Sequence, residues 1–269
     1  MAFYRTNLPT HEVFSLVSII TILLATNINS VQAHSFNFTN LTLGYSNIIY
    51  QGDAHDLASG YLALTNSTQP ATTFPTTGRV LFKPPMTLWD NATGRVANFV
   101  TNFSFIVEAH DKAAATDGLI FFIAPPDTVI PNNSNSLYLG VVDGKNAINQ
   151  FVGVEFDLYP NSFDPYMRHI GIDVNSLISM KTEKWNWVSG SLTKATIKYD
   201  SPSSTLSAVV TNENGQSITI AQVVDLKTVL PNIVRVGLSA TSITGVAHNI
   251  HKWSIVADTV TTTSSVSDI

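Results

Sequence analysis

The sequence contains no cysteine, so the fold cannot rely on disulfide bonds. Small secreted domains usually need such bonds because their cores are small. This chain has 269 residues, enough to bury roughly 70% of its unfolded surface without covalent cross-links. Its composition shows no break that would divide it, and we therefore expect one large domain.

Charged residues are scarce, at 12% of the chain, and the formal net charge is −5. Lys and Arg form no basic block along the sequence. Nucleic acids and anionic membranes attract clustered basic residues, so we expect neither as a partner.

Apolar runs long enough to span a membrane are also missing. The run from Val13 to Ala25 is about thirteen residues, too short to cross roughly 30 Å of hydrocarbon. Arg5 precedes it and Val31-Gln32-Ala33 follows it, which is the layout of a secretory signal cleaved after Ala33. We predict a signal peptide over residues 1–33, a folded domain over 34–258, a flexible tail over 259–269, and a final location outside the cell or in the vacuole.

Glycosylation sequons support entry into the secretory pathway, although Asn-x-Ser/Thr triplets also arise by chance. Asn102 lies within an expected strand, where we expect poor access, so we leave it out of the predicted sites. The predicted sites are Asn37, Asn40, Asn66, Asn91 and Asn132.

Helical periodicity is almost absent, and period-two alternation with β-branched residues recurs instead. Turn residues punctuate nearly every gap, which predicts an all-β sandwich or jelly roll. The expected strands are Ser35–Leu43, Ile48–Gln51, Gly60–Leu64, Arg79–Lys83, Ala97–Val107, Leu119–Ile123, Tyr138–Val142, Gln150–Asp157, His169–Val174, Leu192–Tyr199, Thr205–Val210, Ser217–Val223, Val234–Ala240 and Ile250–Val256.

Many of the few charges gather in one stretch, EFDLYPNSFDPYMRHIGID, which covers residues 155–173. Side chains two apart on a strand share a face. We therefore expect Val152, Val154 and Phe156 to point into a core, and Glu155 and Asp157 to point the other way. A second strand begins at His169, so two neighbouring strands would bring His169 close to Glu155 and Asp157. The loop between them would hold Asn161 and Asp164 over this group.

Crowded carboxylates repel one another unless a cation neutralises them. Carboxylates with an imidazole suit a transition ion such as Mn²⁺, and carboxylates with amide and carbonyl oxygens suit Ca²⁺. A solvated acidic loop is the simpler alternative. A second is the acid pair of a glycosidase, which needs two carboxyl groups flanking the bond. We do not favour it, because the next position on the same face is Tyr159 rather than an acid.

Several motifs in the same order resemble the legume lectin family of L-type lectins. The most specific are Val154-Glu155-Phe156-Asp157 and Arg168-His169-Ile170-Gly171-Ile172-Asp173-Val174-Asn175-Ser176, supported by Asp117-Gly118-Leu119-Ile120-Phe121-Phe122 and Val236-Gly237-Leu238-Ser239-Ala240. The resemblance covers essentially the whole chain after residue 33 and extends to nodule and vegetative-tissue members. It implies a concanavalin-like jelly roll that is not an enzyme, binds glycans or glycoconjugates, and forms a homodimer or higher homo-oligomer through flat sheet faces.

The resemblance also implies adjacent Mn²⁺ and Ca²⁺ ions. Matched by position, Glu155, Asp157, Asp164 and His169 would bind Mn²⁺, and Ser179 would hold a metal-bound water. The Ca²⁺ ligands would be Asp157, Asp164, Asn161 and the backbone carbonyl of Tyr159.

Sugar recognition in the family uses an Asp after a cis peptide bond, which matches Asp117 after Thr116. Asn161 would donate to the sugar and the Tyr159 ring would pack against its apolar face. Thr244 and Gly245, in the late variable loop, complete the implied site.

Two departures from the family pattern affect this site. Ser136-Leu137 stand where many members have Gly-Gly, and the Leu137 side chain would narrow the pocket. The loop at residues 242–246 is short and apolar. The alternative function is therefore a lectin-like storage or apolar-ligand-binding protein with weakened or lost monosaccharide binding.

Overall fold

The computed structural model describes residues 33–38, 46–67, 75–109, 111–112, 115–258 and 260. Within these residues the regular structure is β-strand apart from a 3-10 turn, η1 (Ser136–Tyr138), and one helical turn, α2 (Leu226–Val229). Neither helical turn in this part of the chain is long and apolar enough to cross a membrane. The predicted signal lies outside the described residues except for Ala33, and the predicted tail lies outside them except for Val260.

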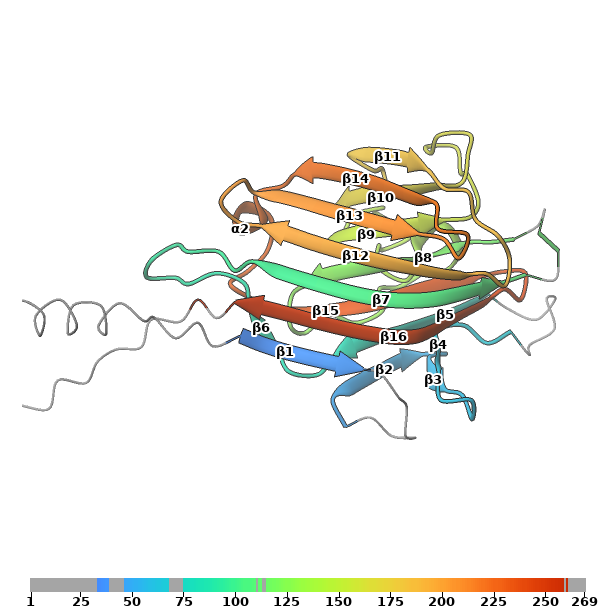
Figure 1. Ribbon diagram of the computed structural model, residues 1–269, viewed down its shortest axis with the longest axis horizontal. Coiled ribbons are helices and arrows are strands. Elements are labelled where there is room, and N and C mark those ends of the chain that lie inside the picture. The colour runs from blue at the N-terminus through green and yellow to red at the C-terminus, as the bar shows by residue number, and fades with distance from the viewer. Residues whose placement is uncertain are drawn as a thin grey trace, which may run out of the picture. The chain divides into compact units, whose positions relative to one another are not determined.

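The strands form two antiparallel sheets, which confirms the predicted jelly-roll β-sandwich (Figure 1). The first, which we call the β7 sheet, has the order β14-β13-β12-β7-β16-β4-β3, and β1 pairs with β16. Its strands are β1 (Ala33–Phe38), β3 (His55–Asp56), β4 (Leu62–Ala63), β7 (Phe99–Glu108), β12 (Leu192–Asp200), β13 (Thr205–Thr211), β14 (Ser217–Val223) and β16 (Ala247–Asp258).

The second sheet, which we call the β9 sheet, has the order β11-β10-β9-β8-β15-β5-β2, and β6 pairs with β15. Its strands are β2 (Ile48–Gly52), β5 (Thr76–Phe82), β6 (Met86–Thr87), β8 (Gly118–Ala124), β9 (Val152–Asp157), β10 (His169–Val174), β11 (Lys181–Lys184) and β15 (Ile233–Ser242).

One apolar core lies between the sheets. Alternate residues of β7, such as Phe103 and Phe105, are buried in it and meet Phe156 of β9 edge-on, with ring centroids 5.8 and 5.0 Å apart. Edge-to-face rings add about 0.5–1.5 kcal/mol beyond the burial of their area. Phe156 and Val154 therefore point inward as predicted, which leaves Glu155 and Asp157 for the opposite face.

A second apolar cluster covers the outer face of the β9 sheet, and includes Ile120, Phe122, Leu139 and Phe151. Its cover is the segment 125–151, between β8 and β9. For this reason β8 and β9 are buried on both faces, and their polar residues must find partners inside the protein.

Side chains of the β9 sheet fasten this covering segment. Arg79, which is buried, donates to the Val129 carbonyl at 2.6 Å and to Thr128 Oγ1 at 2.9 Å. Ser239 Oγ donates to the Leu139 carbonyl at 2.6 Å, and Thr241 Oγ1 donates to the Ser136 carbonyl at 2.6 Å. The position of η1 is thus set by the sheet beneath it.

Most predicted strands are confirmed, and those at His169–Val174 and Ser217–Val223 coincide with β10 and β14. The predicted strand Tyr138–Val142 is wrong. Leu139 has φ 47° and Gly140 has φ 71°, and such left-handed residues end a strand. A Cβ on Gly140 would lie 2.5 Å from Ser239 Oγ, so only glycine allows this close approach.

A buried histidine ties the loop at residues 243–246 to the β7 sheet. His248 Nδ1 lies 3.1 Å from Thr65 Oγ1, which itself donates to the Val246 carbonyl at 2.8 Å. Because the Thr65 proton is used on Val246, Nδ1 of His248 must be the donor, and Nε2 is left buried without a partner. Full burial lowers the pKa of His248 to about 3.

We expect His248→Asn to flatten the pH dependence of stability. The unfolded chain binds a proton at this position below about pH 6.5, whereas the folded chain does not until about pH 3, so the natural protein loses stability as the pH falls through this window. Asn offers a donor at the same place but does not titrate. Between pH 6 and 4 the slope of the unfolding free energy should be shallower by up to about 1.4 kcal/mol per pH unit. Urea unfolding of both proteins at several pH values measures it, and parallel curves would contradict this assignment.

Candidate functional site

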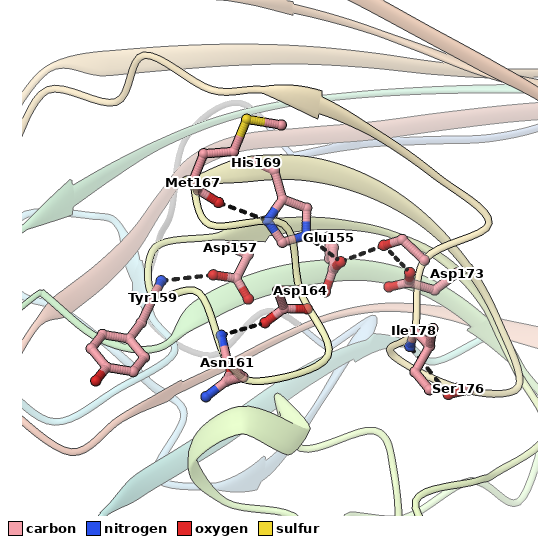
Figure 2. Close-up of polar contacts among 11 residues, drawn as sticks. Glu155, Asp157, Tyr159, Asn161, Asp164, Met167, His169, Asp173, Ser176 and Ile178 are labelled. Carbon is pink, nitrogen blue, oxygen red and sulfur yellow. Dashed lines mark hydrogen bonds and ion pairs between the residues drawn. The ribbon is translucent and has the colours of Figure 1, made fainter.

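Strands β9 and β10 bring the predicted acidic cluster together. Their antiparallel register places His169 opposite Asp157 and Gly171 opposite Glu155. One ligand atom from each of Glu155, Asp157 and His169 lies within 4.8 Å of the others, and all three residues are buried. Figure 2 shows Asp164 from the following loop converging on the same point. The predicted proximity of His169 to both acids is confirmed.

His169 is held by both of its ring nitrogens. Nδ1 lies 3.2 Å from the Met167 carbonyl, and Nε2 lies 3.0 Å from Glu155 Oε1 (Figure 2). Since a carbonyl can only accept, Nδ1 carries a proton and Nε2 is the atom that faces the acids. Burial alone would lower the pKa of His169, but the bond to Glu155 and the charges of Glu155 and Asp157 outweigh it and raise the pKa.

The two aspartates of the cluster are oriented by backbone N–H groups of the loop. Tyr159 N donates to Asp157 Oδ1 at 2.7 Å, and Asn161 N donates to Asp164 Oδ2 at 2.7 Å. Even so, burial raises the pKa of both carboxyl groups, and the charge of Glu155 raises it further. The cluster therefore holds more negative charge than its protein partners neutralise.

Two further residues extend the cluster along β10. Ser179 Oγ lies 2.6 Å from Glu155 Oε1 and 2.7 Å from Asp173 Oδ1. Asp173 is fully buried, its Oδ2 has no partner, and burial together with Glu155 raises its pKa. Gly171 of β10 leaves room for these side chains, because a Cβ on it would collide with Ser179 Oγ and Glu155 Oε1.

This donor set fits a divalent cation. Carboxylate oxygens and Nε2 of His169 converge, and no Lys or Arg of the described chain forms an ion pair with them. Buried charges of one sign are normally paired or bind a metal. An acidic loop in solvent, the simpler alternative, does not agree with the burial of Glu155, Asp157 and His169.

Asp117 lies next to this cluster, at the start of β8. The bond from Thr116 to Asp117 is cis, as predicted. The Asp117 carbonyl accepts from Leu158 N at 2.9 Å, and Gly118 pairs with Asp157. Asp117 is buried except for 5% of its surface, Oδ2 has no partner, and burial raises its pKa to about 6 although the bond from Ser136 opposes this.

The remaining predicted sugar-site residues lie around Asp117 on separate loops. Thr116 Oγ1 lies 2.9 Å from Thr244 Oγ1, and Gly245 follows with φ 72°. Leu137 is half-buried in η1, and the Tyr159 side chain is 47% exposed. The structure thus brings the loop at residues 242–246 into contact with Thr116, which precedes Asp117, and leaves Tyr159 accessible to a ligand.

Ser136 and Asp173 are the residues that sequence reasoning did not assign to the site. Ser136 has φ 53°, a left-handed conformation that favours glycine, and its hydroxyl donates to Asp117 Oδ1 at 3.1 Å. The available signal was Ser136-Leu137 in place of Gly-Gly, but this difference predicted an effect of the Leu137 side chain only. For Asp173 the signal was its place on the same strand face as His169 and Gly171.

The predicted glycosylation residues fall on different parts of the surface. Asn91 and Asn132 are exposed in turns, and Asn37 lies in β1. Asn66 is half-buried, and Asn40 lies outside the described residues. Asn102 is exposed, which corrects the expectation of poor access.

Comparison with known proteins gives one consistent family. The legume lectin domain matches residues 33–268. A nodule lectin of Pisum sativum is 61% identical over all of this chain and all of its own. A non-seed lectin of Pisum sativum is 63% identical over 99% of this chain and 98% of its own. The solved structure of peanut lectin with a nine-residue peptide is 47% identical, with a TM-score of 0.80 over 86% of this chain and all of that one.

These matches extend over both sheets and over every loop that carries the site. Their identities lie far above the level at which only the fold would be shared. The chain therefore belongs to the legume lectin family, whose members are non-enzymatic carbohydrate-binding proteins.

Proposed function

We propose that this protein is a secreted lectin whose glycan site is shaped by two adjacent cations, Mn²⁺ and Ca²⁺. The observation that carries the proposal is the convergence of Glu155, Asp157 and His169, all buried, within 4.8 Å. A buried site of this composition is stable when a cation offsets its charge.

The donor types divide between the two ions. Glu155, Asp157, Asp164 and Nε2 of His169 would hold Mn²⁺, and Ser179 would orient a water on it. Asp157, Asp164, the Asn161 amide oxygen and the Tyr159 carbonyl would hold Ca²⁺. When bound, the ions neutralise the carboxylates and fix the loop at residues 159–164. The backbone bonds from Tyr159 and Asn161 already bend this loop around the two aspartates.

The sugar site would lie over this loop. Asp117 offers the unpartnered Oδ2 as an acceptor for sugar hydroxyls, Asn161 donates, and the exposed Tyr159 ring packs against the apolar face of the sugar. Hydrogen bonds worth about 1 kcal/mol each give weak binding per site. A homodimer or higher homo-oligomer would raise the strength of binding to surfaces that carry many glycans.

Entry into the secretory pathway is part of the same proposal. It rests on the signal-like segment at residues 1–33 and on exposed sequons such as Asn91 and Asn132. The destination would be the cell exterior or the vacuole.

A second candidate function is a lectin-like storage or apolar-ligand-binding protein with weakened monosaccharide binding. The observation that favours it is the Ser136 hydroxyl on Asp117 Oδ1, which occupies one of the two acceptor oxygens that the sugar would use. Leu137 follows Ser136 and is half-buried, and its side chain would narrow the same site. A measurement of sugar binding by the natural protein, which has Ser136, decides between the two functions.

Gly171→Ala should weaken the binding of Mn²⁺ by at least about tenfold, the range seen when a neighbour of a metal ligand is disturbed. The added methyl group would displace Ser179 Oγ and Glu155 Oε1. Titration of free Mn²⁺ by electron paramagnetic resonance measures the affinity. Gly190→Ala is the control, because its methyl group meets nothing within 4 Å although its left-handed φ of 76° costs stability. If Gly171→Ala and Gly190→Ala bind Mn²⁺ with equal affinity, the ion does not bind at the cluster beside Gly171.

Asp117→Asn should abolish binding on a glycan array while both ions stay bound, because the amide can no longer accept from sugar hydroxyls on both of its terminal atoms. Removal of the ions with EDTA should abolish glycan binding and also lower the melting temperature, since a ligand bound only by the folded state stabilises it. If the natural protein with both ions loaded binds no glycan, the second candidate function is favoured instead.

Ser136→Gly should strengthen monosaccharide binding by about fivefold, the equivalent of one hydrogen bond of about 1 kcal/mol, because it frees Asp117 Oδ1. Leu137→Gly should add to this effect by widening the site. Asn133→Gly is the matched control, since Asn133 has the same φ of 53° in the same segment and no bond to Asp117. Calorimetry with simple glycosides measures all three, and equal gains for Asn133→Gly and Ser136→Gly would mean that backbone strain, not the hydroxyl, limits binding.

A further inference from the structure

Asn102 begins an Asn-x-Ser sequon in the interior of the β7 sheet. It lies on β7, opposite Thr196 of β12 and Ser254 of β16, so both neighbouring strands flank it. The adjacent residue Phe103 is buried in the core, and alternation turns the Asn102 side chain outward. The Asn102 side chain is therefore exposed on the outer face of the sheet, although its backbone lies in the middle of a strand.

The side-chain amide of Asn102 is oriented by its neighbour on β12. Thr196 Oγ1 donates to Asn102 Oδ1 at 2.7 Å. Among the described residues, Nδ2 of Asn102 makes no hydrogen bond. N-glycosylation modifies Nδ2 and leaves Oδ1 an acceptor, so the folded protein can keep the bond to Thr196 with a glycan attached.

The surface around Asn102 is polar. Lys194, Thr196 and Lys198 of β12 are exposed, and so is Lys252 of β16. The exposed apolar residues on the strands of this sheet are Val209, Val223 and Val256, and Val256 pairs with the half-buried Val100. The centres of protein–protein interfaces are depleted of charged residues, and lysine is under-represented there. This composition fits a face that stays in contact with solvent.

We propose that Asn102 carries an N-linked glycan, which projects from the centre of the β7 sheet and keeps that face free of protein partners. The proposal rests on the secretory entry proposed above. In the reaction, Nδ2 forms a bond to the anomeric carbon of a lipid pyrophosphate-linked oligosaccharide and loses one proton, and the bond from that carbon to the pyrophosphate oxygen breaks. Self-association of this lectin then uses a surface other than the centre of this sheet.

The test is glycan occupancy at Asn102 and at Asn91 in the full chain expressed in plant cells. Enzymatic removal of glycans in H₂¹⁸O converts each modified Asn to ¹⁸O-labelled Asp, which peptide mass spectrometry identifies. Removal is carried out on the native and on the denatured protein. We expect Asn102 to be modified and its glycan to be released from the native protein as fast as that of Asn91, which lies in an exposed turn.

Three results would overturn the proposal, and they differ in what they say about secretion. Occupancy at Asn91 but not at Asn102 removes the site and leaves secretory entry standing. No occupancy at any sequon removes secretory entry as well. A glycan on Asn102 that is released only after denaturation shows that the face is covered.

Two variants separate the glycan from the local hydrogen bond. Asn102→Gln should lower the intact mass by one glycan, whereas Thr196→Val keeps the sequon and should keep the full mass. If Asn102→Gln leaves the mass unchanged, the glycan is not on Asn102.

Discussion

The repulsion among buried acids between β9 and β10 is the constraint on which the rest of the site depends. Glu155 and Asp157 lie on the strand face opposite the core residues Val154 and Phe156. Both residues are buried, as is His169 of β10. Burial and the charge of Glu155 raise the pKa of Asp157 and of Asp173, and buried carboxylates become compatible with a stable fold when a positive charge joins them.

The fold uses this constraint to organise a surface for ligands. Asp157 belongs to the acidic cluster and pairs with Gly118, whose preceding residue is Asp117. The Asp117 carbonyl also accepts from Leu158 N. The acceptor proposed for sugar hydroxyls is therefore joined to the acidic cluster through backbone hydrogen bonds. Because the family is non-enzymatic, the two carboxylates on β9 are not the acid pair of a glycosidase, and the role proposed for them is metal binding.

Most of this arrangement could be predicted from the sequence because it follows from period-two alternation. Alternation placed Glu155, Asp157 and His169 on one face and Phe156 on the other, and β10 was predicted to the residue. The short strands β3, β6 and β11 were not predicted, since two-residue pairings and the charged segment Lys181–Lys184 show no alternation of apolar residues. The strand expected at Tyr138–Val142 failed because two left-handed residues override its apolar pattern. The bond from Ser136 to Asp117 joins residues 19 apart, and no local pattern encodes such a contact.

Elemental analysis of freshly purified protein, never exposed to a chelator, tests the central claim most directly. If the acidic cluster is a two-ion site, plasma mass spectrometry should find one manganese, or another transition ion in its place, and one calcium per chain. Protein that is folded and contains neither would contradict this assignment, since Glu155, Asp157 and Asp173 would then be stable in the core with only protons to offset their charge.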